Sequence, residues 1–154
     1  MKKILVIAAV ALGAVFAGSD AKAQANWEAG LRFGDNFSAD LTIPIGATPR
    51  LHVPVYFDRF GVGALFDWMF ALDGGPTGLK FYPGVGPEFI FQNQFDFRVS
   101  GDFGAEYSFN FPLTIGIDWR PHFRLTNNAD FNANNWGFIA RFRFGEGVSF
   151  SKSN

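Results

Sequence analysis

The chain has 154 residues, 48% of them hydrophobic, and its 13 Lys and Arg nearly balance its 14 Asp and Glu, giving a formal net charge of −1. This balance excludes the basic surface with which proteins bind nucleic acid, so no nucleic-acid partner is expected. Because the sequence contains no Cys, disulfides and Cys-based zinc sites are excluded as well. It shows no other metal-ligand spacing, phosphate loop or nucleotide fingerprint, and we expect neither a metal nor a cofactor.

The first residues have the pattern of a secretory signal peptide. Two lysines at positions 2 and 3 precede an apolar run from Ile4 to Phe16, and small residues then offer cleavage after Ala23 or Ala25. The run is too short for a membrane-spanning helix, and two Ala-x-Ala sites favour cleavage over an uncleaved anchor. We predict a signal peptide over residues 1–23 and an exported single domain after it.

The remaining chain reads as strands separated by turns rich in Gly, Asn, Asp and Pro, with no helical period. The predicted strands are Trp27–Gly34, Ser38–Ile45, Leu51–Asp58, Phe60–Leu72, Gly78–Gln92, Phe95–Phe109, Pro112–Leu125 and Asn135–Phe144. The one long connector, Thr126–Asn134, is predicted to be a solvated loop. Eight consecutive antiparallel strands predict an all-β, up-and-down transmembrane barrel over residues 24–144, followed by a short C-terminal tail over residues 145–154.

Between Phe95 and Leu125, apolar and polar residues alternate on both sides of a turn at Asn110-Phe111. Successive side chains of a strand point to opposite faces, so this hairpin has one apolar and one charged face. The other strands follow the same rule. A soluble sandwich or lipocalin-like barrel would bury the apolar face, whereas an outer-membrane barrel turns it to lipid.

Three observations favour the membrane. The apolar faces hold roughly two dozen large side chains, which is more than the interior of an eight-stranded barrel accommodates. The polar faces are rich in Gly, Asp and Arg and poor in Lys, unlike a solvated surface. Aromatic residues also fall near strand ends, where a lipid-facing girdle belongs: Trp27, Trp68, Tyr107 and Trp136.

The polar faces are predicted to form a charge network in the lumen, because a buried charge needs a partner. The acids are Glu28, Asp40, Asp67, Glu88, Asp96, Asp102, Glu106 and Asp118, and the bases are Arg32, Lys80, Arg98, Arg120, Arg124, Arg141 and Arg143. Eight acids against seven bases come close to neutrality. If the ends of the barrel meet, Glu28 closes against Arg143.

The hairpin register makes the network more specific. Pairing the two strands about their turn brings Asp102 opposite Arg120. Asp118 is expected to neighbour Arg141 or Arg143 on the last strand. Proline cannot donate a hydrogen bond to a neighbouring strand, yet four prolines lie within predicted strands: Pro54, Pro83, Pro87 and Pro121. Gly84, Gly86 and Pro87 together predict a β-bulge in the fifth predicted strand.

These features resemble the small eight-stranded outer-membrane β-barrel proteins of Gram-negative bacteria, the group that includes the OmpA-type transmembrane domain. The likeness lies in Gly30-Leu31-Arg32-Phe33 of the first strand and Gly116-Ile117-Asp118-Trp119-Arg120-Pro121 of the seventh. It implies a monomer in outer-membrane lipid, inserted by the outer-membrane assembly machinery. It also implies that the last strand is the assembly signal, with Phe138, Phe142 and Phe144, although this chain adds ten residues after it.

Neither histidine indicates catalysis. His52 starts the third strand and is expected near one rim, whereas His122 lies near the other rim. Ser100 and Asp102 neighbour His122 in the hairpin register, but several arginines crowd that patch and favour a plain polar network. We expect no catalytic residue and a structural or surface-interaction role. The alternatives are a narrow channel or small-ligand transport barrel, and a soluble secreted barrel that binds an apolar ligand.

Overall fold

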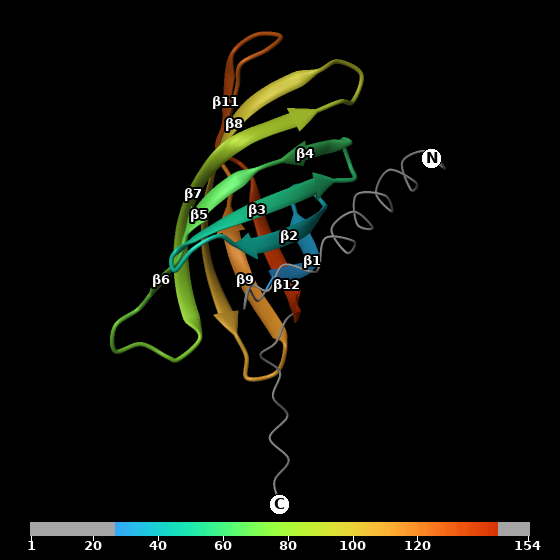
Figure 1. Ribbon diagram of the computed structural model, residues 1–154. Coiled ribbons are helices and arrows are strands. Elements are labelled where there is room, and N and C mark those ends of the chain that lie inside the picture. Colours follow the sequence, from blue (N-terminus) through green and yellow to red (C-terminus); the bar gives the residue numbers. More distant parts are fainter. Residues whose placement is uncertain (1–26, 145–154) are drawn as a thin grey trace, which may run out of the picture.

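The computed structural model describes residues 27–144 (Figure 1). The signal peptide predicted over residues 1–23 and the tail over residues 145–154 lie outside the described residues. None of the described residues belongs to a helix that is long and apolar enough to cross a membrane.

The described chain folds into strands joined by turns. They are β1 (Trp27–Gly34), β2 (Ser38–Pro44), β3 (Pro49–Tyr56), β4 (Gly61–Gly63), β5 (Leu65–Trp68), β6 (Phe70–Ala71), β7 (Leu79–Ile90), β8 (Asp96–Ser108), β9 (Leu113–Trp119), β10 (His122–Arg124), β11 (Asp130–Asn132) and β12 (Trp136–Phe144). The bounds of β1 equal the predicted ones, and β3 begins two residues before the predicted third strand, Leu51–Asp58. The other predicted strands each contain one or more of the observed segments.

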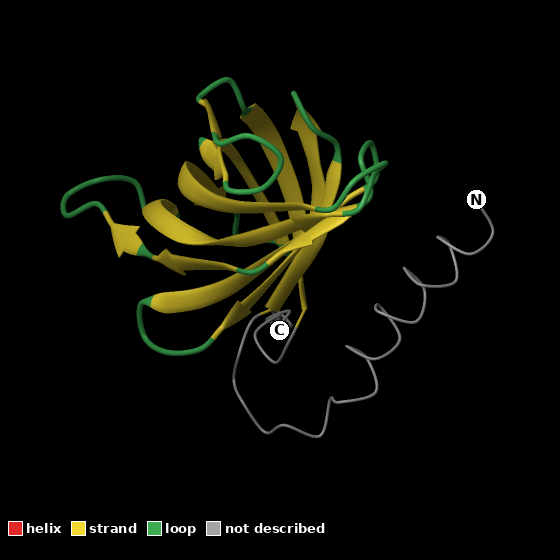
Figure 2. Cartoon of the chain, turned by 90° about the horizontal axis from the view of Figure 1, so that it is seen from above, coloured by secondary structure: helices red, strands yellow, loops and turns green. Residues whose placement is uncertain are grey.

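The strands form a closed, eight-stranded antiparallel barrel, which confirms the predicted all-β barrel fold. Segments β4, β5 and β6 all pair with β7 and together form one strand of the barrel. Segments β9 and β10 both pair with β8 and together form another. Pairing of β12 with β1, from Trp27 opposite Phe144 to Gly34 opposite Gly137, closes the wall. Figure 2 shows the ring of strands from above.

The registers fix the width of the barrel. Following the hydrogen-bonded neighbours once around the wall and back to β1 gives a displacement of about ten residues, which corresponds to a strand tilt of about 40°. A barrel with eight strands at this tilt has an interior that side chains fill. Inward-facing residues must therefore pack and pair with one another.

The prolines interrupt the ladder without shifting it, and the predicted bulge is wrong. β7 pairs with β8 in one unbroken register from Leu79 opposite Tyr107 to Ile90 opposite Asp96. Between β4 and β5, the Ala64 amide donates to the Pro87 carbonyl at 3.0 Å, but Pro87 has no amide hydrogen to return. Each such proline omits one hydrogen bond, and the strand continues in the same register.

The predicted loop Thr126–Asn134 is only partly a loop. Within it, β11 pairs with β10, placing Phe131 opposite Phe123. The prediction from the sequence missed β11, because Asn-rich sequence favours turns and only Phe131 within this strand has a strand-forming side chain. This hairpin extends the wall on the side of β7, β8 and β10.

The barrel is inverted relative to a soluble protein. Among the described residues, 24 large apolar side chains are exposed and five are buried, whereas 20 polar or charged residues are buried. The alternation predicted from the sequence therefore places its apolar face outside and its charged face inside.

Gly30 is required where β1 meets β12. A Cβ at this position would lie 2.0 Å from the Ala140 carbonyl oxygen and 2.5 Å from the Arg141 Cα. We expect Gly30→Val to destabilise the barrel by about 3 kcal/mol or more, because backbone atoms must move apart at the closing pair. The fraction that refolds in detergent, measured by gel mobility without heating, should fall sharply. Ala29→Val, on the outer face of the same strand, is the control, and equal refolding of both variants would contradict the expectation.

Candidate functional site

His52 lies in the interior, within ion-pair distance of three aspartates from three different strands. Its Nδ1 is 2.8 Å from Asp102 Oδ2 and 3.0 Å from Asp67 Oδ2, and its Nε2 is 2.8 Å from Asp40 Oδ2. All four side chains are fully buried. The prediction that His52 lies near a rim is wrong, because β3 begins at Pro49 and His52 is therefore the fourth of its eight residues, not the second residue of a strand that begins at Leu51.

The contacts of His52 indicate an imidazolium. Carboxylate oxygens accept hydrogen bonds and cannot donate them, so both ring nitrogens carry hydrogen when the ring bonds to aspartates on both sides. Arg120 Nη2 also lies 3.1 Å from His52 Nε2, because both nitrogens donate to the same oxygen, Asp40 Oδ2. His52, Asp67 and Asp102 also have the grouping of a metal site among the described residues. Nδ1, the ring nitrogen that would bind the metal, is already in direct contact with an oxygen of each aspartate, so the three side chains fit an ion-pair cluster better than a metal site.

Arg120 is the second centre of charge. Its guanidinium lies 2.7 Å from Asp40 Oδ2, 3.2 Å from Asp102 Oδ1 and 2.9 Å from Asp118 Oδ2. The residue sits between β9 and β10, and it is fully buried. The planar guanidinium offers five donors, which lets one side chain hold several carboxylates at once.

A second group of ion pairs lies nearer the end of the barrel at which β1 begins. Arg50 binds Asp67 at 3.0 Å and Glu106 at 2.9 Å, and its guanidinium also stacks over the Tyr82 ring, 4.5 Å from the ring centroid. Arg141 binds Glu28 at 3.0 Å and also contacts Glu106. Glu106 therefore links the two arginines.

The pairs join into one lumen network that crosses the interior. It consists of Glu28, Arg32, Asp40, Arg50, His52, Asp67, Asp102, Glu106, Asp118, Arg120 and Arg141. At one end Thr114 donates to Glu28 at 2.9 Å. At the other, Arg32 binds Asp118 at 2.7 Å and reaches the backbone carbonyls of Asn36 and Asn135. The interior is a polar plug.

Most predicted lumen residues lie inside. The buried ones are Glu28, Arg32, Asp67, Glu88, Arg98, Asp102, Glu106, Asp118, Arg120 and Arg141. Glu88 accepts a hydrogen bond from the Tyr56 hydroxyl at 2.5 Å, and Arg98 approaches Asp96 at 3.4 Å.

Four predicted lumen residues lie at the ends of the barrel instead. Lys80, the second residue of β7, is exposed. Asp96 begins β8, and Arg124 ends β10, with a loose 3.8 Å approach to Asp130. Arg143 donates to the carbonyls of Phe109 and Phe111 in the neighbouring turn.

The predicted pairs have mixed outcomes. Asp102 and Arg120 do pair in the interior. Glu28 lies opposite Arg143 in the backbone register, but its side chain binds Arg141. The predicted Asp118 partner is wrong, because in the observed register Asp118 faces Gly137, and its carboxylate turns to Arg32 and Arg120.

Sequence reasoning missed Arg50 and misplaced His52. The predicted third strand began at Leu51, which left Arg50 in a turn, whereas the strand begins at Pro49. The signal was present: residues 50, 52, 54 and 56 alternate with Leu51, Val53 and Val55, and extending that alternation by one residue places Arg50 inside.

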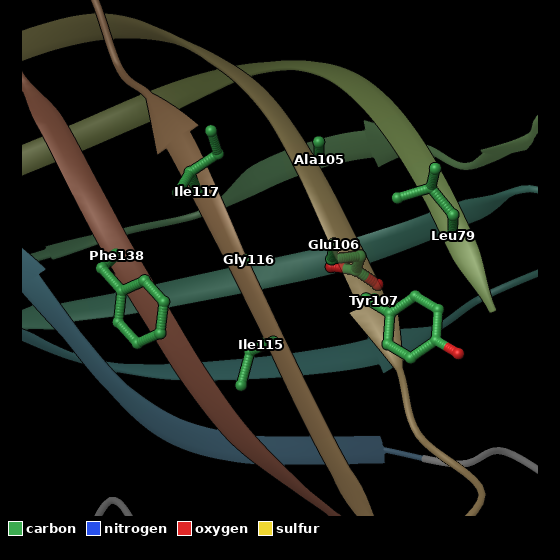
Figure 3. Close-up of a pocket in the computed structure, with 8 residues that line it drawn as sticks. All are labelled: Leu79, Ala105, Glu106, Tyr107, Ile115, Gly116, Ile117 and Phe138. Atoms are coloured by element: carbon green, nitrogen blue, oxygen red, sulfur yellow. The ribbon is translucent and has the colours of Figure 1, made fainter. Parts of the chain in front are cut away.

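The outer surface carries the predicted aromatic residues. Trp68 and Trp136 are exposed, Trp27 and Tyr107 are partly exposed, and Trp27 stacks on Phe144. Phe138 and Phe142 are exposed on β12. A shallow hollow on the same outer surface forms around Ala105 and Gly116 (Figure 3). Its other lining residues are Leu79, Glu106, Tyr107, Ile115, Ile117 and Phe138.

The Ser100, His122 and Asp102 arrangement does not form a catalytic triad. His122 lies opposite Ser100, as the hairpin register predicts. However, the Asp102 carboxylate is bound to His52 and Arg120, so it cannot orient His122. The His122 Nδ1 and the Ser100 hydroxyl have no hydrogen-bond partner among the described residues.

The fold and the site define a class: a closed antiparallel β-barrel with an apolar outer wall and a charge-filled interior. In comparison with known proteins, the sequence matches no family model, and no curated protein or solved structure matches it significantly.

Proposed function

We propose that the protein is an integral outer-membrane β-barrel with a plugged lumen and a structural or surface-interaction role rather than a catalytic one. Its inverted distribution of side chains carries the proposal. A described surface with 24 exposed large apolar side chains, 16 of them in strands, is costly in water and favourable in lipid. The sequence pattern of an export signal and of a last strand ending in aromatics supports delivery to the outer membrane by its assembly machinery.

The lumen network favours a plug over a channel. Water-filled channels are found in barrels of about sixteen strands, whereas an eight-stranded barrel is filled by its side chains. Arg120 and His52 bind carboxylates from several strands and cross the interior. An ion would have to break several buried pairs to pass.

A soluble carrier of an apolar ligand needs the opposite distribution, with apolar side chains inside. Of the large apolar residues, only Tyr56, Leu65, Tyr82, Ile90 and Ile139 are buried within residues 27–144.

Folding and conductance test the proposal together. The purified chain should reach a heat-modifiable folded form in detergent or lipid vesicles and aggregate in plain buffer. Planar bilayers that contain the folded protein should show no steady conductance. A folded, monomeric protein in detergent-free buffer would contradict membrane insertion, whereas stable conductance would favour the channel.

A further inference from the structure

The wall of the barrel is much taller on one side than on the other. In Figure 1 the hairpin of β7 and β8, together with β11, rises above β1, β2 and β12. β7 and β8 have 12 and 13 residues, whereas β1, β2 and β12 have eight, seven and nine. The short side is the one where β12 and β1 close the barrel.

The apolar outer face follows this difference. On β8 it extends from Phe95 just before the strand to Phe109 just after it, a height of about 35 Å at a rise of about 3.3 Å per residue and a tilt of about 40°. On β12 it extends from Trp136 to Phe144, about 20 Å by the same rule. The apolar band of an outer-membrane barrel is about 25 Å tall, so the short side falls below it.

Tryptophans mark both ends of the short side. Trp136 begins β12 and stacks on Trp119, with ring centroids 5.9 Å apart. Trp27 begins β1 at the opposite end of the barrel. Such aromatic rings favour the two membrane interfaces. Their positions therefore set the interfaces closer together on this side than a full bilayer allows.

We propose that the wall formed by β12, β1 and β2 holds the adjoining membrane locally thin, and this inference rests on the proposed membrane insertion. Tilting the whole barrel does not remove the mismatch between the short apolar wall and the bilayer thickness, because tilt raises or lowers the wall in the membrane but does not make it taller. Lipid adapts to a short apolar wall by thinning, at a modest cost for each Å of mismatch. The partner of this surface is a thinned lipid layer, beside a wall of β7, β8 and β10 that meets lipid of normal thickness.

Spin labels at matched heights test this directly, and the absence of Cys from the chain makes single-Cys labelling straightforward. The registers place Leu31 of β1 and Phe103 of β8 at about the same level along the barrel axis. Leu31→Cys and Phe103→Cys, labelled with a nitroxide in lipid vesicles, report depth through their relative exposure to oxygen and a water-soluble Ni(II) chelate. We expect the label at 31 to lie about 5–7 Å shallower than the label at 103.

A second pair near the other end distinguishes thinning from tilt. Phe142→Cys on β12 and Tyr107→Cys on β8 lie at about the same lower level, and thinning predicts equal depth for them. Equal depths at 31 and 103 would overturn the inference in favour of a membrane of uniform thickness around the barrel. Depth differences of opposite sign in the two pairs would overturn it in favour of a tilted barrel. Full Ni(II) access at all four labels would instead contradict insertion, and with it the proposed function.

The native tryptophans give a reading if a cysteine variant refolds poorly. In a chain with Trp136 as its single Trp, lipids brominated close to the headgroup should quench the fluorescence most. Strongest quenching by bromine near the end of the acyl chain would mean that the short wall is sunk in a membrane of full thickness.

Discussion

Replacing His52 by Leu should lower the free energy of unfolding by about 3 kcal/mol or more, because it leaves buried carboxylates without their shared cation. Asp40, Asp67 and Asp102 approach the ring within 3.0 Å, and each is fully buried. Leucine has a similar volume but offers no donor, so the loss is electrostatic rather than a cavity effect. Urea unfolding of the protein folded in detergent micelles, followed by gel mobility, measures the change.

The second histidine provides the matched control. His122 is largely buried too, but its Nδ1 has no hydrogen-bond partner among the described residues, and no described carboxylate pairs with it. His122→Leu should therefore change the stability far less than His52→Leu. Nitrogen NMR of the rings adds a direct reading, since His52 should show two protonated nitrogens at pH 7. Similar losses for both variants, or a neutral His52 ring, would refute the assigned imidazolium.

Replacing Arg120 by Met should cost about 3–5 kcal/mol, the range for removing one partner of a buried ion pair. Arg120 holds Asp40, Asp102 and Asp118 within 3.2 Å, and methionine fills the space without the charge. The three buried carboxylates then repel one another without the cation that they share. Urea unfolding in micelles again measures the effect.

Arg124→Met is the control for this variant. Its side chain is about one-third exposed, and its only described ion pair is the 3.8 Å approach to Asp130, so the change should be small. Adding Asp102→Asn to Arg120→Met should recover part of the lost stability, because it removes one of the three carboxylates while His52 keeps Asp40 and Asp67 as partners. No recovery, together with a small effect of Arg120→Met alone, would show that the lumen pairs contribute little.

The sequence allowed the barrel to be predicted because alternation is a local property. In the Phe95–Leu125 hairpin, every second side chain is apolar, and the structure places that face outside. The pairing of Asp102 with Arg120 also followed, because a tight turn fixes the register of the two strands that it joins.

The remaining contacts depend on distances across the interior. Which residues meet there is set by the strand tilt and by the closing register of β1 and β12, and neither can be read from one strand alone. His52 meets Asp102, and Asp118 turns to Arg32, for this reason. Strand β11 was missed because its pairing with β10 outweighs the turn preference of its Asn-rich sequence.

Contact between lipid chains and named methyl groups tests the central claim that the apolar face meets lipid. The methyl groups of Val99 and Ile117 are exposed on the outer face, whereas those of Leu65 and Ile139 are fully buried inside. In methyl-labelled protein in lipid nanodiscs, nuclear Overhauser effects from the acyl chains should reach the first pair and not the second. Water cross-peaks at Val99 and Ile117 without acyl-chain contacts would contradict a lipid-facing wall.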